Sequence, residues 1–286
     1  MEAVTFVMLL IATDQLQQLQ GVQVVDARPI EAYAAAHLPG ALHLDPATLS
    51  EERDGVQGLL KPVETLAALL SEAGLQPARH VVVYSGMDKP DDLKNAARLF
   101  WILEYLGFPR VSVLDGGFAK WRAEGRPVEA GAPPVPPEPV PELSLTPRPE
   151  LLAVREDVLA IIGTSRGTLV DMRAPEEYAG LAKKDFVLRA GHIPGACNLP
   201  ATDFAVKMGS DIAPYYTLRP VTELKQAIQG DASAPVITYC NTGRDASVGY
   251  LVYRLAGIDR VAVYDGSMAE WGNHPGLSVA GHATQE

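Results

Sequence analysis

The amino-acid sequence predicts an α/β protein in which one kind of domain occurs twice. Three observations lead to this prediction: four motifs recur in the same order, apolar runs alternate with helical patterns, and a proline-rich stretch separates the halves. A repeat of this kind means that one structural unit has been duplicated. We expect one domain over residues 1–126, a linker over 127–150 and a second domain over 151–286.

Four short motifs mark the repeat. Each returns in the second half with most of its residues kept: VVDAR at 24–28 as LVDMR at 169–173, HLPGALHL from His37 as HIPGACNL from His192, VVVYS at 81–85 as VITYC at 236–240, and VLDGGFAKW ending at Trp121 as VYDGSMAEW ending at Trp271. The shared order indicates a duplicated fold.

Short β-branched runs predict the strands of each domain. Four of them are typical of buried parallel strands: 81–84, 111–114, 236–239 and 261–264. Between them, apolar residues follow a helical spacing over 93–106 and 248–255, and a glycine comes after each. Strands that alternate with crossover helices predict a mostly parallel central sheet flanked by helices.

The stretch between the halves reads GAPPVPPEPVPE at 131–142, with six prolines in twelve residues. Proline has no backbone N–H and a fixed φ, so it interrupts helices and central strands. We therefore expect an extended linker. A cleft between two domains tethered in this way is a natural ligand site.

Composition excludes several classes of function. The formal charge of −11 argues against nucleic acid or an anionic membrane surface as the main partner. No apolar run reaches the ~18–20 residues of a membrane span. The apolar start, MEAVTFVMLLIAT, carries Glu2 where a signal peptide would carry positive charge. We expect a first strand or an extension there, and a cytoplasmic protein.

The chain has two cysteines, Cys197 and Cys240. Two cysteines in a chain of this size form neither a disulfide framework nor a zinc cluster, so we expect no metal and no cofactor. Cys197, in GACNLP, is expected to be an inert strand residue. Cys240 instead ends a predicted strand and opens a polar loop, and a helix is expected to begin near Ala246 or Ser247.

The loop after Cys240 is suited to an anion and to a reactive thiol. Backbone N–H groups of such a loop, with a helix N-terminus behind them, bind anions and lower the pKa of a cysteine. Arg244 can add a positive charge at the rim, whereas Asp245 is most simply an N-cap whose carboxylate would oppose a thiolate. The residues expected to bind substrate here are Asn241, Thr242, Gly243, Arg244 and Asp245. The other interpretation of Cys240 is a small apolar residue that ends a strand.

These motifs together resemble the tandem-domain rhodaneses, and the likeness runs from about residue 10 to 280. The residues that carry it are Asp171 and Arg173, GHIPGA at 191–196, CNTGRD at 240–245 and DGSMAEW at 265–271. The resemblance implies a first domain without a catalytic cysteine, and Ser85 stands at that position. It also implies a six-residue catalytic loop that begins at Cys240. Asp245 replaces the threonine of the best-known members, which leaves the preferred substrate open.

The resemblance implies a sulfurtransferase in which Cys240 takes sulfur from a small anionic donor, carries it as a persulfide and passes it to cyanide or a thiol. Thiosulfate and 3-mercaptopyruvate are the donors that it suggests. Relatives specific for mercaptopyruvate tend to carry an arginine four residues after the arginine of the D-x-R motif, and this chain has Glu177 there. Arg244 beside the cysteine suits a compact dianion, so we favour thiosulfate.

The second copy has ten extra residues between its D-x-R motif and its histidine, and this segment contains Lys183, Lys184 and Arg189. We interpret it as a flap that offers positive charge to the donor. Ser267 is expected at the pocket border. Structural support is expected from Asp171, Arg173, His192 and Trp271.

Two other classes of function fit parts of the pattern. A cysteine phosphatase or arsenate reductase uses a similar loop, but needs an arginine six residues after the cysteine, where this chain has Ala246. A tandem module that relays sulfur or binds a partner without turnover would keep the fold and lack activity with small donors.

Overall fold

The computed structural model describes residues 8–133, 143–229 and 234–281. It confirms the predicted fold class, because each of two compact units holds a five-stranded parallel sheet flanked by helices. None of the helices in these ranges is long and apolar enough to cross a membrane. Most of the proline-rich stretch, 134–142, lies outside the described residues, as does the very start of the chain, 1–7.

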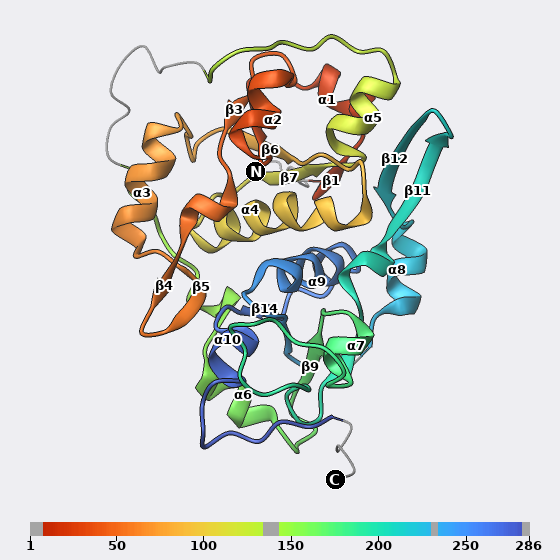
Figure 1. Cartoon of the computed structure of the whole chain (residues 1–286). Coiled ribbons are helices and arrows are strands. Elements are labelled where there is room, and N and C mark those ends of the chain that lie inside the picture. Colours follow the sequence, from red (N-terminus) through yellow and green to blue (C-terminus); the bar gives the residue numbers. More distant parts are fainter. Residues whose placement is uncertain (1–7, 134–142, 230–233, 282–286) are drawn as a thin grey trace, which may run out of the picture. The chain divides into compact units, whose positions relative to one another are not determined.

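The first unit contains a sheet of strand order β1-β7-β6-β2-β3. Its strands are β1 (Leu10–Ile11), β2 (Val22–Asp26), β3 (Leu42–His43), β6 (His80–Tyr84) and β7 (Val111–Leu114). Its helices are α1 (Thr13–Gln18), α2 (Ile30–Ala35), α3 (Val63–Glu72), α4 (Leu93–Tyr105) and α5 (Gly117–Ala123). Figure 1 shows α4 on one side of this sheet and α1, α2 and α5 on the other. The strand expected near the start of the chain is therefore present as β1.

The second unit repeats this plan with the strand order β10-β9-β13-β14-β8. Its strands are β8 (Leu152–Ala153), β9 (Thr168–Asp171), β10 (Cys197–Asn198), β13 (Val236–Tyr239) and β14 (Val261–Tyr264). Its helices are α6 (Arg155–Ile161), α7 (Pro175–Tyr178), α8 (Val221–Ala227), α9 (Arg244–Leu255) and α10 (Ser267–Trp271). The core of the unit gathers side chains from α6, β13 and α10, with Trp271 only 1% exposed.

Two hairpins depart from the predicted division at 1–126 and 151–286. Hairpin β4 (Ser50–Arg53) and β5 (Val56–Leu60) comes from the first half of the sequence but belongs to the second compact unit. Hairpin β11 (Ala205–Ser210) and β12 (Ala213–Leu218) comes from the second half, and all of it beyond Ala205 belongs to the first unit. Each half of the sequence thus contributes one hairpin to the compact unit formed mainly by the other half.

Candidate active site

Cys240 lies at the carboxyl end of the central strand of the second sheet. Strand β13 ends at Tyr239 and is paired in parallel with β9 on one side and β14 on the other. Ligands of open α/β sheets bind at this edge, where the loops after the strands converge. The cysteine is 1% exposed.

The loop is short because Gly243 adopts a left-handed backbone, with φ of 78°. This conformation is costly for residues that have a Cβ, and it lets α9 begin directly afterwards at Arg244. The helix therefore starts two or three residues earlier than expected. Gly243 occupies the N-cap position, so the prediction of Asp245 as N-cap is wrong. Asp245 lies instead in the first turn of α9.

Three backbone N–H groups point at the sulfur of Cys240. They belong to Thr242, Asp245 and Ala246, and each lowers the pKa of the thiol. Burial, and after it the charge of Asp245, act in the opposite direction and raise that pKa to about 11. The predicted lowering of the pKa is therefore wrong for the free thiol, because desolvation outweighs the amides. The amides still provide donors for a negative sulfur.

Ser267 holds the cysteine from the neighbouring turn. Its hydroxyl accepts a hydrogen bond from the N–H of Cys240 at 3.1 Å and donates one to the carbonyl of Tyr264 at 2.7 Å. Met268 N–H donates to the Cys240 carbonyl at 3.0 Å. Ser267 has a φ of 47°, an unusual conformation for a residue other than glycine. The turn that opens α10 is thus built around the backbone of Cys240.

Asn241 connects the loop to α7. Its side-chain Nδ2 donates to Oε1 of Glu177 at 2.9 Å, and only 6% of the residue is exposed. Its Oδ1 is buried and accepts no hydrogen bond from any residue that the structure describes. Glu177, which sequence reasoning considered only as a determinant of the donor, therefore also fixes the first residue after the cysteine.

The four residues expected to give structural support are buried or partly buried in the second unit. Arg173 donates to both carboxylate oxygens of Asp171 and to the carbonyl of Gly191 at 2.8 Å. His192 stacks on Tyr178, with ring centroids 3.7 Å apart. The indole N–H of Trp271 donates to the carbonyl of Ser278 at 2.8 Å. These contacts hold the chain around the ends of β9 and α10.

The extra segment of the second copy, which contains Lys183, Lys184 and Arg189, is anchored near its carboxyl end by Arg189. Arg189 donates to the carbonyls of four residues: Trp271, Gly272, His274 and Leu277. Its guanidinium therefore binds the backbone after α10, and its role in substrate binding stays a prediction. Lys183 and Lys184 are exposed, as the flap hypothesis requires.

The equivalent loop of the first unit has a different lining. Ser85, fully buried, replaces the cysteine, and its Oγ has no hydrogen-bond partner among the described residues. The N–H groups of Asp88 and Lys89 donate to the carboxylate of Asp92 at 3.0 and 3.3 Å. Backbone N–H groups of this loop therefore bind a carboxylate of the protein itself, that of Asp92.

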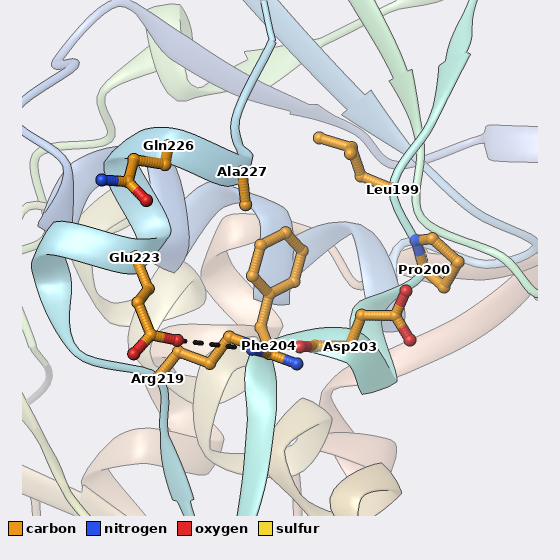
Figure 2. A pocket seen from close by; sticks show the side chains of 8 residues that line it. All are labelled: Leu199, Pro200, Asp203, Phe204, Arg219, Glu223, Gln226 and Ala227. Atoms are coloured by element: carbon orange, nitrogen blue, oxygen red, sulfur yellow. Dashed lines mark hydrogen bonds and ion pairs between the residues drawn. The ribbon is translucent and has the colours of Figure 1, made fainter.

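Figure 2 shows a hollow of about 380 Å³ elsewhere in the second unit. It is lined by Leu199, Pro200, Asp203, Phe204, Arg219, Glu223, Gln226 and Ala227. Arg219, its cation, already donates to the carbonyl of Asp203 at 2.5 Å and to Glu223 at 3.3 Å (Figure 2). None of these residues belongs to the Cys240 loop. Within the described ranges, no three His, Cys, Asp or Glu side chains lie close enough together to bind a metal ion.

Sequence reasoning missed the part of hairpin β4–β5 that borders the Cys240 loop. Leu60 N–H donates to Oδ2 of Asp265 at 2.7 Å, and Gly58 packs against Thr242. A fifth repeated motif was available as a signal: LKPVETL from Leu60 returns as LRPVTEL from Leu218. In the first unit, Leu218 N–H makes the matching bond to Asp115, at 2.9 Å.

Comparison with known proteins finds the same architecture and a consistent class of activity. The chain is 34% identical over 260 residues to a thiosulfate sulfurtransferase of Azotobacter vinelandii, which covers 89% of each chain. It is 31% identical over 247 residues to a 3-mercaptopyruvate sulfurtransferase of Rattus norvegicus, covering 86% of this chain and 80% of the relative. The crystal structure of the 3-mercaptopyruvate sulfotransferase SseA of Escherichia coli superposes with a TM-score of 0.77 and 28% identity, covering 91% and 98% of the two chains.

The fold, the cysteine loop and these relatives define the protein as a sulfurtransferase with two α/β domains. Residues 12–124 and 154–274 each match the family described as rhodanese-like domain. The chain belongs to the rhodanese family.

Proposed function

We propose that the protein moves a sulfane sulfur from thiosulfate to cyanide or a thiol through a persulfide on Cys240. The thiol first loses its proton to solvent. The thiolate then attacks the outer sulfur of thiosulfate, so that a new S–S bond forms while the bond to the sulfite sulfur breaks and sulfite leaves with its electron pair. Cyanide or a thiolate afterwards attacks the outer sulfur of the persulfide, and the Cys240 thiolate is the leaving group.

The observation that carries this proposal is the convergence of three amides on Cys240. Thr242, Asp245 and Ala246 direct their N–H groups at the sulfur of a cysteine that is only 1% exposed. Preorganised donors aimed at a developing charge are worth far more in such a site than in solution. The free thiol has a pKa of about 11, whereas each transfer step leaves a sulfur anion within reach of these donors.

The choice of thiosulfate is supported by the side chain at position 177. A planar carboxylate such as that of mercaptopyruvate is best recognised by a bidentate arginine. Glu177 offers a carboxylate at this position and is bound to Asn241 beside the cysteine. Arg244, partly exposed in the first turn of α9, suits the compact sulfonate end of thiosulfate.

A 3-mercaptopyruvate sulfurtransferase is the second candidate, because relatives with that name are 29–31% identical to this chain over 86–90% of it. The kcat/KM for the two donors, with cyanide as acceptor and thiocyanate or pyruvate as product, distinguishes the two candidates. We expect thiosulfate to be the better donor. In Glu177→Arg we expect the ratio of kcat/KM values to move toward mercaptopyruvate by roughly tenfold or more. The reason is that a carboxylate at position 177 is replaced by a guanidinium, which can bind the carboxylate of mercaptopyruvate through two hydrogen bonds.

Mass spectrometry of the protein after exposure to thiosulfate tests the reaction itself. We expect a gain of one sulfur atom that maps to Cys240 and disappears on addition of cyanide. Sulfur transfer by Cys240→Ser at the parent rate would refute the proposal. A module that only relays sulfur or binds a partner would give no thiocyanate with free thiosulfate.

A further inference from the structure

Hairpin β4–β5 comes from the first repeat of the sequence, yet it packs at the Cys240 loop in the second unit. It does so at two points. Leu60 N–H donates to Oδ2 of Asp265 at 2.7 Å, and Asp265 is 4% exposed. Gly58 lies directly against Thr242.

The contact at Gly58 leaves no space for a side chain. A Cβ at this position would lie 2.5 Å from Cβ of Thr242 and 3.1 Å from both its Cγ2 and its carbonyl oxygen. A distance of 2.5 Å is not found between real side chains, so Thr242 or the hairpin would have to move. The N–H of Thr242 is one of the three that point at the sulfur of Cys240. The position of that donor therefore depends on the absence of a side chain at residue 58.

The contact at Leu60 acts on the other side of the cysteine. Asp265 opens the turn in which Ser267 accepts the N–H of Cys240 and Met268 donates to its carbonyl. The hairpin thus touches both segments that hold Cys240, the loop after it and the turn before α10.

The first unit provides an internal comparison. There Leu218 of β12 makes the bond to Asp115 that Leu60 makes to Asp265. The residue two positions before it, equivalent to Gly58, is Tyr216, whose N–H donates to the carbonyl of Met87 at 2.8 Å. Hairpin β11–β12, which packs at the loop of Ser85, therefore carries the large side chain of Tyr216 at this position. Hairpin β4–β5, which packs at the loop of Cys240, carries Gly58.

We propose that hairpin β4–β5 is a positioning element of the active site, in which Gly58 sets the place of the Thr242 amide and hence the stabilisation of negative sulfur on Cys240. This inference rests on the proposed function. Gly58 is a positioning residue, since it acts through Thr242.

Gly58→Ala tests the proposal, and Gly55→Ala in the same hairpin is its matched control. Both glycines have left-handed backbones, with φ of 83° and 77°, so both substitutions carry similar conformational strain. Nothing lies within 4 Å of a Cβ at residue 55. We expect kcat for thiosulfate:cyanide transfer to fall roughly tenfold or more in Gly58→Ala, as for a displaced oxyanion donor, and to stay within about twofold in Gly55→Ala.

A pH titration of Cys240 alkylation by iodoacetamide gives a readout that a general loss of stability would not change. We expect the pKa of the thiol to rise in Gly58→Ala and to stay at the parent value in Gly55→Ala, because only the first variant displaces a donor. Removing the Thr242 side chain should restore part of the lost activity, so Gly58→Ala/Thr242→Gly should exceed Gly58→Ala.

Equal kcat and equal titration curves in the two alanine variants would overturn the inference. So would strictly additive effects of Gly58→Ala and Thr242→Gly. Failure of the proposed function is a separate result, since the parent protein itself would then form no persulfide on Cys240.

Discussion

The charge of Asp245 provides a direct test of how the site controls its nucleophile. Burial and this carboxylate together hold the pKa of Cys240 at about 11, against an ordinary value of 9.0. That difference of about two units corresponds to roughly 3 kcal/mol against the thiolate. At pH 7 only about one molecule in 10⁴ then carries a thiolate, so the rate of any attack by the free sulfur should rise about tenfold per pH unit.

Asp245→Asn removes the charge but keeps the backbone N–H that points at the sulfur. Because Asp245 is the largest cause of the raised pKa after burial, we expect its loss to lower the pKa by about half a unit to one unit. Alkylation by neutral iodoacetamide at pH 7 to 8 should accelerate about three- to tenfold, and the midpoint of the pH profile should move down by the same amount.

The assay is best done in a Cys197→Ser background, so that modification reports on Cys240 alone. Asp203→Asn, at an exposed carboxylate of the same unit, serves as the control for a general change of charge. A profile of Asp245→Asn that superposes on that of its parent, or a midpoint that moves upward, would refute the role assigned to Asp245.

Three further predictions concern the residues around the loop. Ser267→Ala leaves the buried Cys240 N–H and the Tyr264 carbonyl without their hydroxyl partner. We therefore expect the free energy of unfolding in urea to fall by about 2–4 kcal/mol and kcat to fall as well. Unchanged values for both would contradict the role of this hydroxyl. Lys183→Gln/Lys184→Gln should raise KM for thiosulfate at low salt and weaken its salt dependence, and an unchanged KM would exclude the flap hypothesis. Arg189→Met should lower the melting temperature by several degrees more than Arg166→Met, an exposed control, because four carbonyls lose their donor; equal losses would show that these bonds contribute nothing to stability.

Much of the fold could be predicted from the sequence because the same local pattern is present twice. The strands predicted at 236–239 and 261–264 are β13 and β14, with the same bounds. The loop of Cys240 was also readable, since a strand, a polar turn with Gly243 and an apolar helical pattern follow one another without interruption.

The features that were missed depend on contacts between distant residues. The bond between Leu60 and Asp265 joins positions 205 apart, and the bond between Asn241 and Glu177 joins positions 64 apart. The pKa of Cys240 was predicted in the wrong direction because a sequence displays neighbouring amides but not burial. The N-cap at Gly243 was missed because Asp245 is the better capping residue by type, whereas the left-handed turn selects glycine.

The exchange of hairpins between the two halves has a consequence for how the protein matures during synthesis. Hairpin β4–β5 is synthesised long before its partner Asp265, by roughly 10–40 s at ordinary rates of elongation. The second compact unit is thus not a contiguous piece of chain, because it joins residues 50–61 to segments from the second half of the sequence. Pairings of such long range are the slow ones in folding. The contacts of β4–β5 with Thr242 and Asp265 can therefore form only after most of both repeats has been translated.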